Sequence, residues 1–118
     1  MYVRYIYNNQ THYGHLSEGV ITKLEGKMFD SIELSDETVS ASAVKLLSPC
    51  EPSKVVCVGL NYLDHAKEMD QELPKAPLLF MKPSTTVIAH QDEIKAPGNA
   101  GRLDYEGELA IVIGKQTK

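Results

Sequence analysis

The sequence predicts a mainly β fold of the α+β class, with a small N-terminal β domain at residues 1–50 and a second domain at residues 51–118. Three observations support this prediction. Short apolar runs rich in β-branched and aromatic residues recur along the chain, separated by turn-forming residues. One stretch, near residue 65, has the composition of a helix. Two prolines within four residues, Pro49 and Pro52, interrupt any helix or central strand and mark the domain boundary.

The N-terminal domain is predicted to be a β meander. Tyr2–Tyr7 has the composition of a strand, and Asn8–Gln10 that of a turn, because asparagine adopts left-handed backbone conformations readily. Return strands are expected at 11–16 and 20–24. Residues 28–48 contain only short, weakly patterned pieces.

Within this domain, His12 and His15 are three residues apart on one predicted strand. Side chains three apart on a strand point to opposite faces. We therefore expect no metal to be shared between these two histidines.

The second domain is predicted to begin with a buried strand at 54–58. The helix Leu63–Met69 follows, with Asn61 or Asp64 as its cap. A buried strand is expected at 78–81. Further strands are predicted at 86–89, 93–95 and 109–113, the last being an unbroken apolar run of the kind found inside sheets.

Alternating acidic residues precede the last apolar run. If that strand begins near Asp104, then Asp104, Glu106 and Glu108 share one face at steps of roughly 6–7 Å. Like charges beside a core are unfavourable unless a proton or a cation neutralises them. A divalent cation with oxygen ligands would do so. The alternative is a strand end whose carboxylates are simply solvated.

The predicted helix carries a second polar pair. His65 and Glu68 are three residues apart, which makes them neighbours on one helical face. A carboxylate that orients an imidazole is the arrangement of a general base and its partner. An ordinary surface pair on a helix is the alternative.

Composition excludes several classes of protein. The net charge of −4 and the pI near 5.5 argue against a nucleic-acid partner. No apolar segment approaches the roughly 20 residues that cross a bilayer. The first residues lack the apolar core of a signal peptide. We therefore expect a cytoplasmic protein without a membrane partner.

The position of the strongest predicted strand is also informative. Residues 109–113 lie almost at the end of the sequence, and nothing follows that could pair with or cover them. A long apolar edge left open would invite aggregation. We expect this chain to be the front part of a longer protein, or to need another chain to complete its fold.

Taken in order, the motifs from Lys54 to Lys115 resemble those of the fumarylacetoacetate hydrolase (FAH) family. Each motif alone is weak, but their order and spacing are highly specific. The N-terminal part is similar to the small β domain that precedes the catalytic domain in many bacterial members. The matching residues are Val56–Tyr62 with His65 and Glu68, Pro77, Phe80–Ser84, Pro97, Asp104–Ala110 and Ile113–Lys115.

The resemblance implies the start of a mixed β-roll catalytic domain, truncated here, and usually a homodimer. It also implies a Mg²⁺ or Mn²⁺ ion and small oxo acids or β-diketo acids as substrates. The family reactions pass through a metal-stabilised enolate. They include isomerisation or decarboxylation of the 2-hydroxyhepta-2,4-diene-1,7-dioate type, oxaloacetate decarboxylation, and carbon–carbon hydrolysis of acylpyruvates.

The resemblance also assigns roles to residues. Glu106 and Glu108 match the metal-binding glutamates, His65 the catalytic histidine, and Glu68 its partner. The third metal carboxylate and the substrate-binding lysine lie beyond the residues of this chain. Asp104 falls just before the motif and is not expected to replace the third ligand.

One departure from the family pattern concerns the substrate. Position 60 is leucine here, where some members carry arginine, which puts one possible substrate contact in doubt. The substrate-binding residues of this chain are unknown. By itself this chain is expected to be inactive. The alternative function is that of a truncated, catalytically incomplete binding or assembly module.

Overall fold

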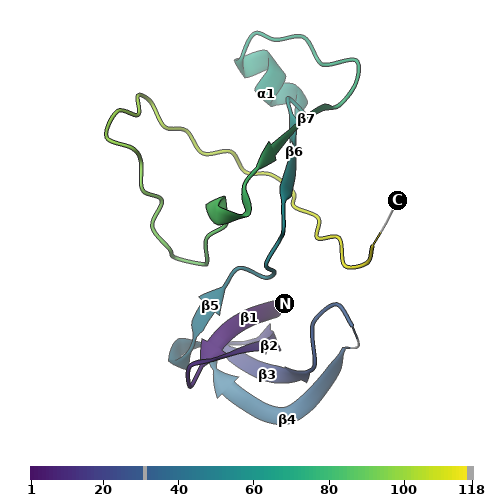
Figure 1. Cartoon of the computed structure of the whole chain (residues 1–118), viewed down its shortest axis with the longest axis vertical. Helices are drawn as coiled ribbons and strands as arrows, with labels where there is room; N and C mark the ends of the chain where they lie inside the picture. The colour runs from purple at the N-terminus through teal and green to yellow at the C-terminus, as the bar shows by residue number, and fades with distance from the viewer. Residues whose placement is uncertain (31, 117–118) are drawn as a thin grey trace. The chain divides into compact units, whose positions relative to one another are not determined.

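The computed structural model describes residues 1–30 and 32–116. Backbone contacts divide the chain into two units (Figure 1). The first unit contains Met1–Cys50 together with the segment from Ile88 onward, and the second contains Glu51–Val87. The expected mainly β fold is confirmed, because within the described residues most regular structure is antiparallel strand and the α-helix is short.

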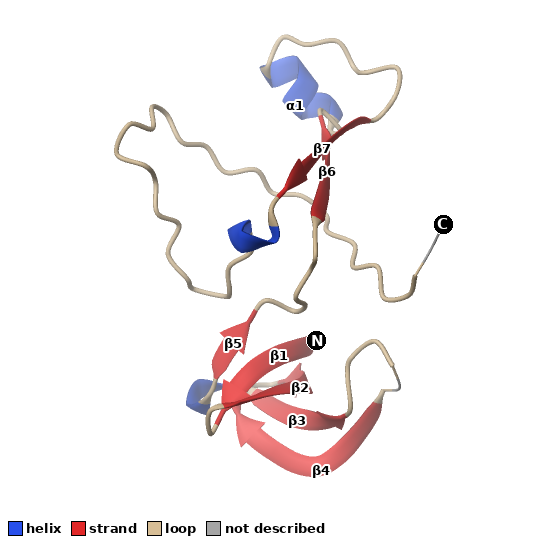
Figure 2. Cartoon of the chain, in the orientation of Figure 1, coloured by secondary structure: helices blue, strands red, loops and turns tan. Residues whose placement is uncertain are grey.

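The first unit is built on a five-stranded antiparallel sheet in the order β4-β3-β2-β1-β5 (Figure 2). Its strands are β1 (Tyr2–Tyr7), β2 (Gln10–Ser17), β3 (Val20–Glu25), β4 (Glu33–Ser40) and β5 (Lys45–Leu47), with a 3₁₀ turn at Ala41–Ala43. Tight turns at 8–9 and 18–19 join the first three strands, so neighbouring strands pair directly.

The backbone of these two turns explains their sequence. Asn8 and Asn9 have φ values of 49° and 59°, and Glu18 and Gly19 have values of 48° and 79°. Positive φ at both central residues defines the type I′ hairpin turn, whose twist matches that of paired strands. The predicted asparagine turn is thus confirmed at residues 8–9, and Gln10 begins the next strand.

The core of the first unit lies on one face of this sheet. Val3, Tyr5 and Ile21 are buried there. Partly buried apolar side chains from the other strands and the 3₁₀ turn pack around them, namely Leu16, Val39, Ala41, Val44 and Leu46. The alternation of β1, in which Val3 and Tyr5 share a face, therefore produces the core directly.

Strand β4 corrects the expectation of short, weakly patterned pieces between residues 28 and 48. It is eight residues long and pairs with β3, with an irregularity between Thr22 and Leu24. Most of its side chains are exposed, because it is an edge strand. Charged residues such as Asp36 and Glu37 protect an edge from pairing with other chains, but they hide the apolar alternation that identifies a strand.

The second unit contains β6 (Val55–Gly59), α1 (Leu63–Glu68), β7 (Leu78–Lys82) and a 3₁₀ turn at Ser84–Thr86. β6 and β7 form an antiparallel pair. The strand expected at 78–81 is therefore present, but its predicted burial is wrong, since all five residues of β7 are exposed. Among the described residues, no helix is long and apolar enough to cross a membrane.

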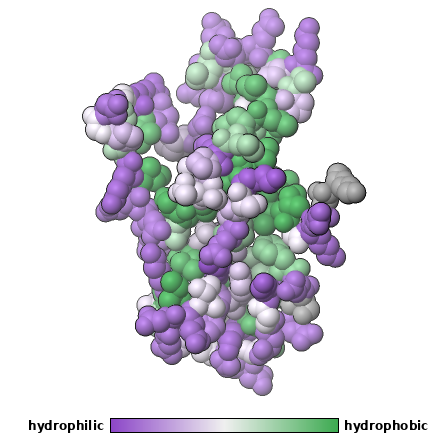
Figure 3. All heavy atoms as spheres, in the orientation of Figure 1, coloured by the Kyte–Doolittle hydropathy of each residue, from purple (hydrophilic) through white to green (hydrophobic). Residues whose placement is uncertain are grey.

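The predicted strands at 86–89, 93–95 and 109–113 are wrong for the described part of the chain, which has no strand after Lys82. Leu109 and Ile111 are 82% and 79% exposed. Hydrophobic side chains are accordingly visible at the surface (Figure 3). A strand needs a backbone partner as well as β propensity, and residues 109–113 belong to neither sheet of the described chain.

Candidate active site

Helix α1 carries the predicted catalytic pair. Its six residues are too few for a stable isolated helix. Ala66, 1% exposed, anchors one face by packing. The predicted caps are wrong, because Tyr62 occupies the N-cap position and makes no side-chain capping bond. Asp64 instead lies in the first turn, and its Oδ1 is 3.4 Å from Lys67 Nζ.

The C-terminal end of α1 is held by backbone bonds. The Gln71 amide donates to the Ala66 carbonyl at 2.9 Å, and the Asp70 amide donates to the Lys67 carbonyl at 3.1 Å. This pair of bonds is the Schellman motif, which requires a left-handed residue just past the helix. Asp70, with a φ of 51°, fills that position.

The structure places His65 and Glu68 on this helix, one turn apart. His65 is half-buried and Glu68 is exposed. The carbonyl of His65 accepts a hydrogen bond from the Met69 amide at 3.0 Å, so the backbone of His65 belongs to the last helical turn. The helix therefore presents an imidazole and a carboxylate on one face, as the spacing predicted.

The connection from β6 to α1 contains a feature that the sequence did not reveal. Leu60 has a φ of 50°. A bulky residue in the left-handed region is an outlier, and such outliers gather at functional sites. Leucine gives no sequence signal for this conformation, which only the backbone discloses.

The predicted metal ligands Glu106 and Glu108 lie close together in sequence, in an irregular and exposed segment. A Cβ built on Gly107, between them, would meet no described atom within 4 Å apart from its chain neighbours. Asp104 is engaged by Arg102, whose Nε donates to its Oδ1 at 2.8 Å. The alternation on a single strand face is therefore not formed here.

The donor chemistry of Glu106 and Glu108 fits Mg²⁺ or Mn²⁺, because both ions favour carboxylate oxygens. Their number does not complete a site. Within residues 1–30 and 32–116, no group of three or more histidine, cysteine, aspartate or glutamate side chains could hold a metal ion. The two glutamates lie in the first unit, and His65 with Glu68 in the second.

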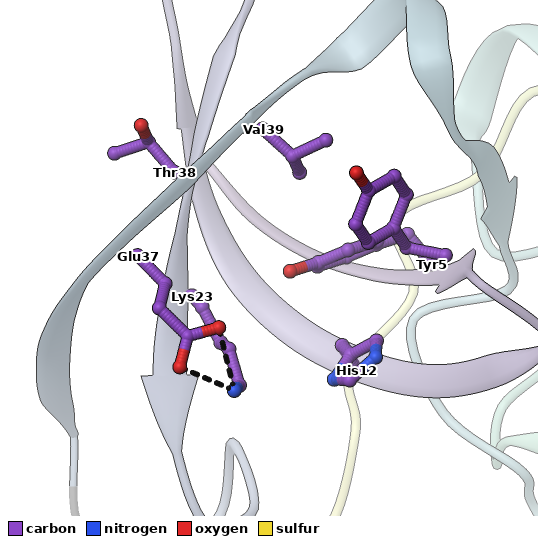
Figure 4. A pocket seen from close by; sticks show the side chains of 7 residues that line it. Tyr5, His12, Lys23, Glu37, Thr38 and Val39 are labelled. Carbon is purple, nitrogen blue, oxygen red and sulfur yellow. Dashed lines mark hydrogen bonds and ion pairs between the residues drawn. The ribbon is translucent and has the colours of Figure 1, made fainter.

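A small hollow of about 50 Å³ opens on the sheet of the first unit (Figure 4). Lys23 Nζ donates to both carboxylate oxygens of Glu37, each at 2.9 Å. This bond raises the pKa of Lys23, and burial raises the pKa of Tyr5. The rings of Tyr5 and His12 lie 5.5 Å apart between centroids. The remaining lining residues are Tyr7, Thr38 and Val39.

A second ion pair ties the segment after residue 88 to strand β5. Lys45 Nζ lies 3.2 Å from Asp92 Oδ1, and the Ala89 amide donates to Asp92 Oδ2 at 3.0 Å. Both interactions favour the ionised carboxylate. They lower the pKa of Asp92, and the hydrogen bond from Ala89 has a larger effect than Lys45.

Comparison with known proteins shows which families the chain matches. Residues 54–118, more than half of the chain, match the family described as fumarylacetoacetate (FAA) hydrolase, C-terminal. Residues 1–49 match the family described as Rv2993c-like, N-terminal. Named relatives of the chain include enzymes.

Three relatives illustrate the similarity. An uncharacterised protein of Archaeoglobus fulgidus is 47% identical over 107 residues, which are 89% of this chain and 40% of that protein. Human mitochondrial oxaloacetate tautomerase FAHD2A is 45% identical over 78 residues, 65% of this chain and 25% of that protein. The crystal structure of 5-carboxymethyl-2-hydroxymuconate delta-isomerase from Mycobacterium smegmatis superposes with a TM-score of 0.61 at 25% identity, over 74% of this chain and 34% of that one.

This chain thus spans less than half the length of each of these relatives. The ordered motifs, the mainly β fold and the match over residues 54–118 agree with one another. The chain belongs to the fumarylacetoacetate hydrolase family.

Proposed function

We propose that this chain forms the N-terminal part of a metal-dependent enzyme that moves a proton within a small oxo acid, shifting a keto–enol or double-bond equilibrium. The observation that carries the proposal is the family match over residues 54–118, which includes His65, Glu68, Glu106 and Glu108. Because the chain covers less than half of its relatives, the activity is proposed for the longer protein.

The names of two relatives favour isomerisation over bond cleavage. One relative is an oxaloacetate tautomerase and another a delta-isomerase of a hydroxymuconate. Both reactions relocate a proton next to a carbonyl group and need no attacking water. Hydrolysis of acylpyruvates and decarboxylation of oxo acids are the competing reactions within the same family.

His65 would move the proton. A half-buried imidazole on a short helix can accept a proton from carbon and return it at another position. Glu68, one turn further along α1, would orient the ring and stabilise its protonated form. These two residues would act as base and orienting group.

Glu106 and Glu108 would hold Mg²⁺ or Mn²⁺, with a third carboxylate from outside this chain. When bound, a divalent cation supplies Lewis-acid stabilisation of the negative charge that develops on the substrate oxygens. The exposure of both glutamates and the open space beside Gly107 leave room for the ion and for the remaining ligands. We further propose a homodimer in the cytoplasm for the longer protein.

The test is an assay of the longer protein against a panel of oxo acids, following enol loss, carbon dioxide release and acyl cleavage separately. We expect enol loss with oxaloacetate or a related diacid to be fastest. His65→Ala should abolish it, whereas His90→Ala, an exposed histidine outside the motifs, should not. Turnover by hydrolysis alone, or full activity of His65→Ala, would overturn the assignment.

The metal ligands need a separate readout. Glu106→Gln and Glu108→Gln should each weaken Mn²⁺ binding by more than about tenfold, measured by calorimetry, since even outer-shell changes have effects of that size. Glu93→Gln removes an exposed carboxylate elsewhere in the same unit and serves as the matched control. Unchanged affinity in both glutamine variants would rule out these ligands.

A second function has an observation in its favour. β7 is exposed along its whole length, and the described chain offers no complete metal site. As an independent product, residues 1–118 would be a catalytically incomplete binding or assembly module. Metal analysis and turnover of the isolated chain distinguish the two functions, because robust turnover excludes the module and stable folding without metal or turnover supports it.

A further inference from the structure

The route from β6 to helix α1 is very short. β6 ends at Gly59 and α1 begins at Leu63, so residues 60–62 must turn the chain from a strand into the helix that carries His65. A Cβ built on Gly59 would lie 3.1 Å from Leu78 Cδ2, so the end of the strand is packed closely against β7. Tyr62 has an extended backbone, with a φ of −113°. The change of direction therefore falls on the two residues between them.

Leu60 has the unusual backbone conformation in this connection between β6 and α1. Its φ of 50° differs by roughly 110° from the value near −60° that is common for leucine. A rotation of that size about one bond redirects everything downstream, including the whole of α1. The conformation is costly for a branched side chain, so the surrounding structure must impose it.

We infer that Leu60 is a positioning residue, whose left-handed backbone fixes the direction in which α1 leaves β6 and therefore where His65 presents its imidazole. The inference rests on the proposed function of His65. Leu60 acts through the backbone and does not need to touch the substrate. Near-attack geometry is sensitive to displacements of about 1 Å, which can change a rate by about a hundredfold.

The other end of α1 supports this view. Asp70, with a φ of 51°, also lies in the left-handed region. Two non-glycine residues in this region thus bracket a helix of six residues that has little burial of its own. A short helix held at both ends by a defined backbone has one direction, whereas a flexible connection would allow many.

Substitutions at position 60 separate positioning from stability. Leu60→Gly removes the steric cost of positive φ and also frees the connection to adopt other conformations. We expect kcat of the longer protein to fall by about tenfold or more, with KM and thermal stability little changed. Leu60→Asn, which adopts the left-handed region readily, should retain most of the wild-type kcat.

The matched control is Glu18→Gly. Glu18 has a φ of 48°, nearly that of Leu60, but it lies in the β2–β3 turn of the first unit. The same change of backbone there should leave kcat unchanged. Equal activity of Leu60→Gly and wild type would overturn the inference. So would a loss of activity in Leu60→Asn as large as that in Leu60→Gly, because the lost side chain would then be responsible.

A readout without turnover distinguishes failure of this inference from failure of the proposed function. The amides of Met69 and Gln71 donate to the carbonyls of His65 and Ala66, and their hydrogen exchange reports on α1. In the 118-residue chain, Leu60→Gly should speed exchange of both amides by about tenfold, whereas Leu60→Asn should not. If exchange responds in this way while His65→Ala remains active, the function is wrong and the positioning holds. Unchanged exchange in Leu60→Gly overturns the positioning itself.

Discussion

The close approach of strands β2 and β3 at Gly14 predicts a large effect of a very small substitution. A Cβ at this position would overlap Ile21 Cγ2 and would lie 2.8 Å from the Thr22 carbonyl oxygen and 3.2 Å from Tyr5 Cε1. Ordinary contacts of this kind are at least about 3.5 Å. Gly14→Ala therefore requires neighbouring atoms to move by about 1 Å.

The neighbours of Gly14 have little freedom to move. Ile21 is fully buried in the core, and Thr22 belongs to the paired register of β2 and β3. Overpacking a core typically costs about 1–3 kcal/mol, and two rigid contacts favour the upper end of that range. Alanine also restricts the unfolded chain and returns about 0.4–1 kcal/mol. We expect a net loss of about 2 kcal/mol, or a fall in Tm of about 8–16 °C for a small domain.

Urea unfolding followed by tyrosine fluorescence measures this loss, since the chain has six tyrosines and no tryptophan. Gly98→Ala is the matched control, because a Cβ there meets nothing within 4 Å among the described atoms. It should change the free energy of unfolding by less than about 0.5 kcal/mol.

A double-mutant cycle tests the cause of the loss. Ile21→Ala removes the clashing methyl group, so its own cost should be smaller by at least about 0.5 kcal/mol when Gly14 is already alanine. If the two changes add, or if Gly14→Ala is as stable as Gly98→Ala, the steric reasoning is refuted.

Four further predictions follow from the backbone and the charges. Glu18→Asn should stabilise the chain by about 0.5–1 kcal/mol in urea unfolding, because Asn-Gly is the favoured type I′ pair; no gain would contradict the turn assignment. Asp70→Gly should raise the free energy of unfolding by a similar amount, because glycine removes the steric cost of positive φ at the C-terminal end of α1. A lower free energy of unfolding would argue against the Schellman motif. The Ala89 amide hydrogen bond and the Lys45 ion pair lower the pKa of Asp92, so they stabilise the chain above the ordinary pKa of 3.8, and this stabilisation is lost as pH falls through the lower folded value. Carbon-13 NMR titration should place the midpoint of Asp92 below 3.8, and a higher midpoint would refute these contacts. Burial raises the pKa of Tyr5, so its contribution to the stability of the fold is complete below pH about 10 and is lost as pH rises through the higher folded pKa. Ultraviolet titration should show one tyrosine ionising at higher pH than the others, and six equivalent tyrosines would contradict its burial.

Much of the first unit could be predicted from local pattern. The strands near 2–7, 11–16 and 20–24 and the asparagine turn are present, because alternation and turn chemistry act over a few residues. Strand β4 escaped prediction because an edge strand tolerates charges on its exposed side chains. Its existence depends on β3, which pairs with it.

The candidate site also has one feature that the local sequence predicted and one that depends on tertiary structure. The spacing of His65 and Glu68 predicted neighbours on one helical face, and the structure has them one turn apart on α1. The shared strand face expected for Glu106 and Glu108 depends on strand pairing, and their segment lies outside both sheets of the described chain. The roles of all four residues remain predictions until the variants are measured.

By itself, the sequence determined the hairpins of the first unit, the short helix with its histidine and carboxylate, and the ordered motifs that identify the family. Only the tertiary structure decided that Gly14 lies against Ile21, that Leu60 adopts a left-handed backbone, and that the apolar run at 109–113 stays exposed and outside both sheets of the described chain. The physical reason is the separation along the sequence between the residues that interact. Turns, propensities and helical spacing are settled between residues close in sequence, whereas burial, strand pairing and an imposed backbone conformation depend on segments that come together from elsewhere in the chain.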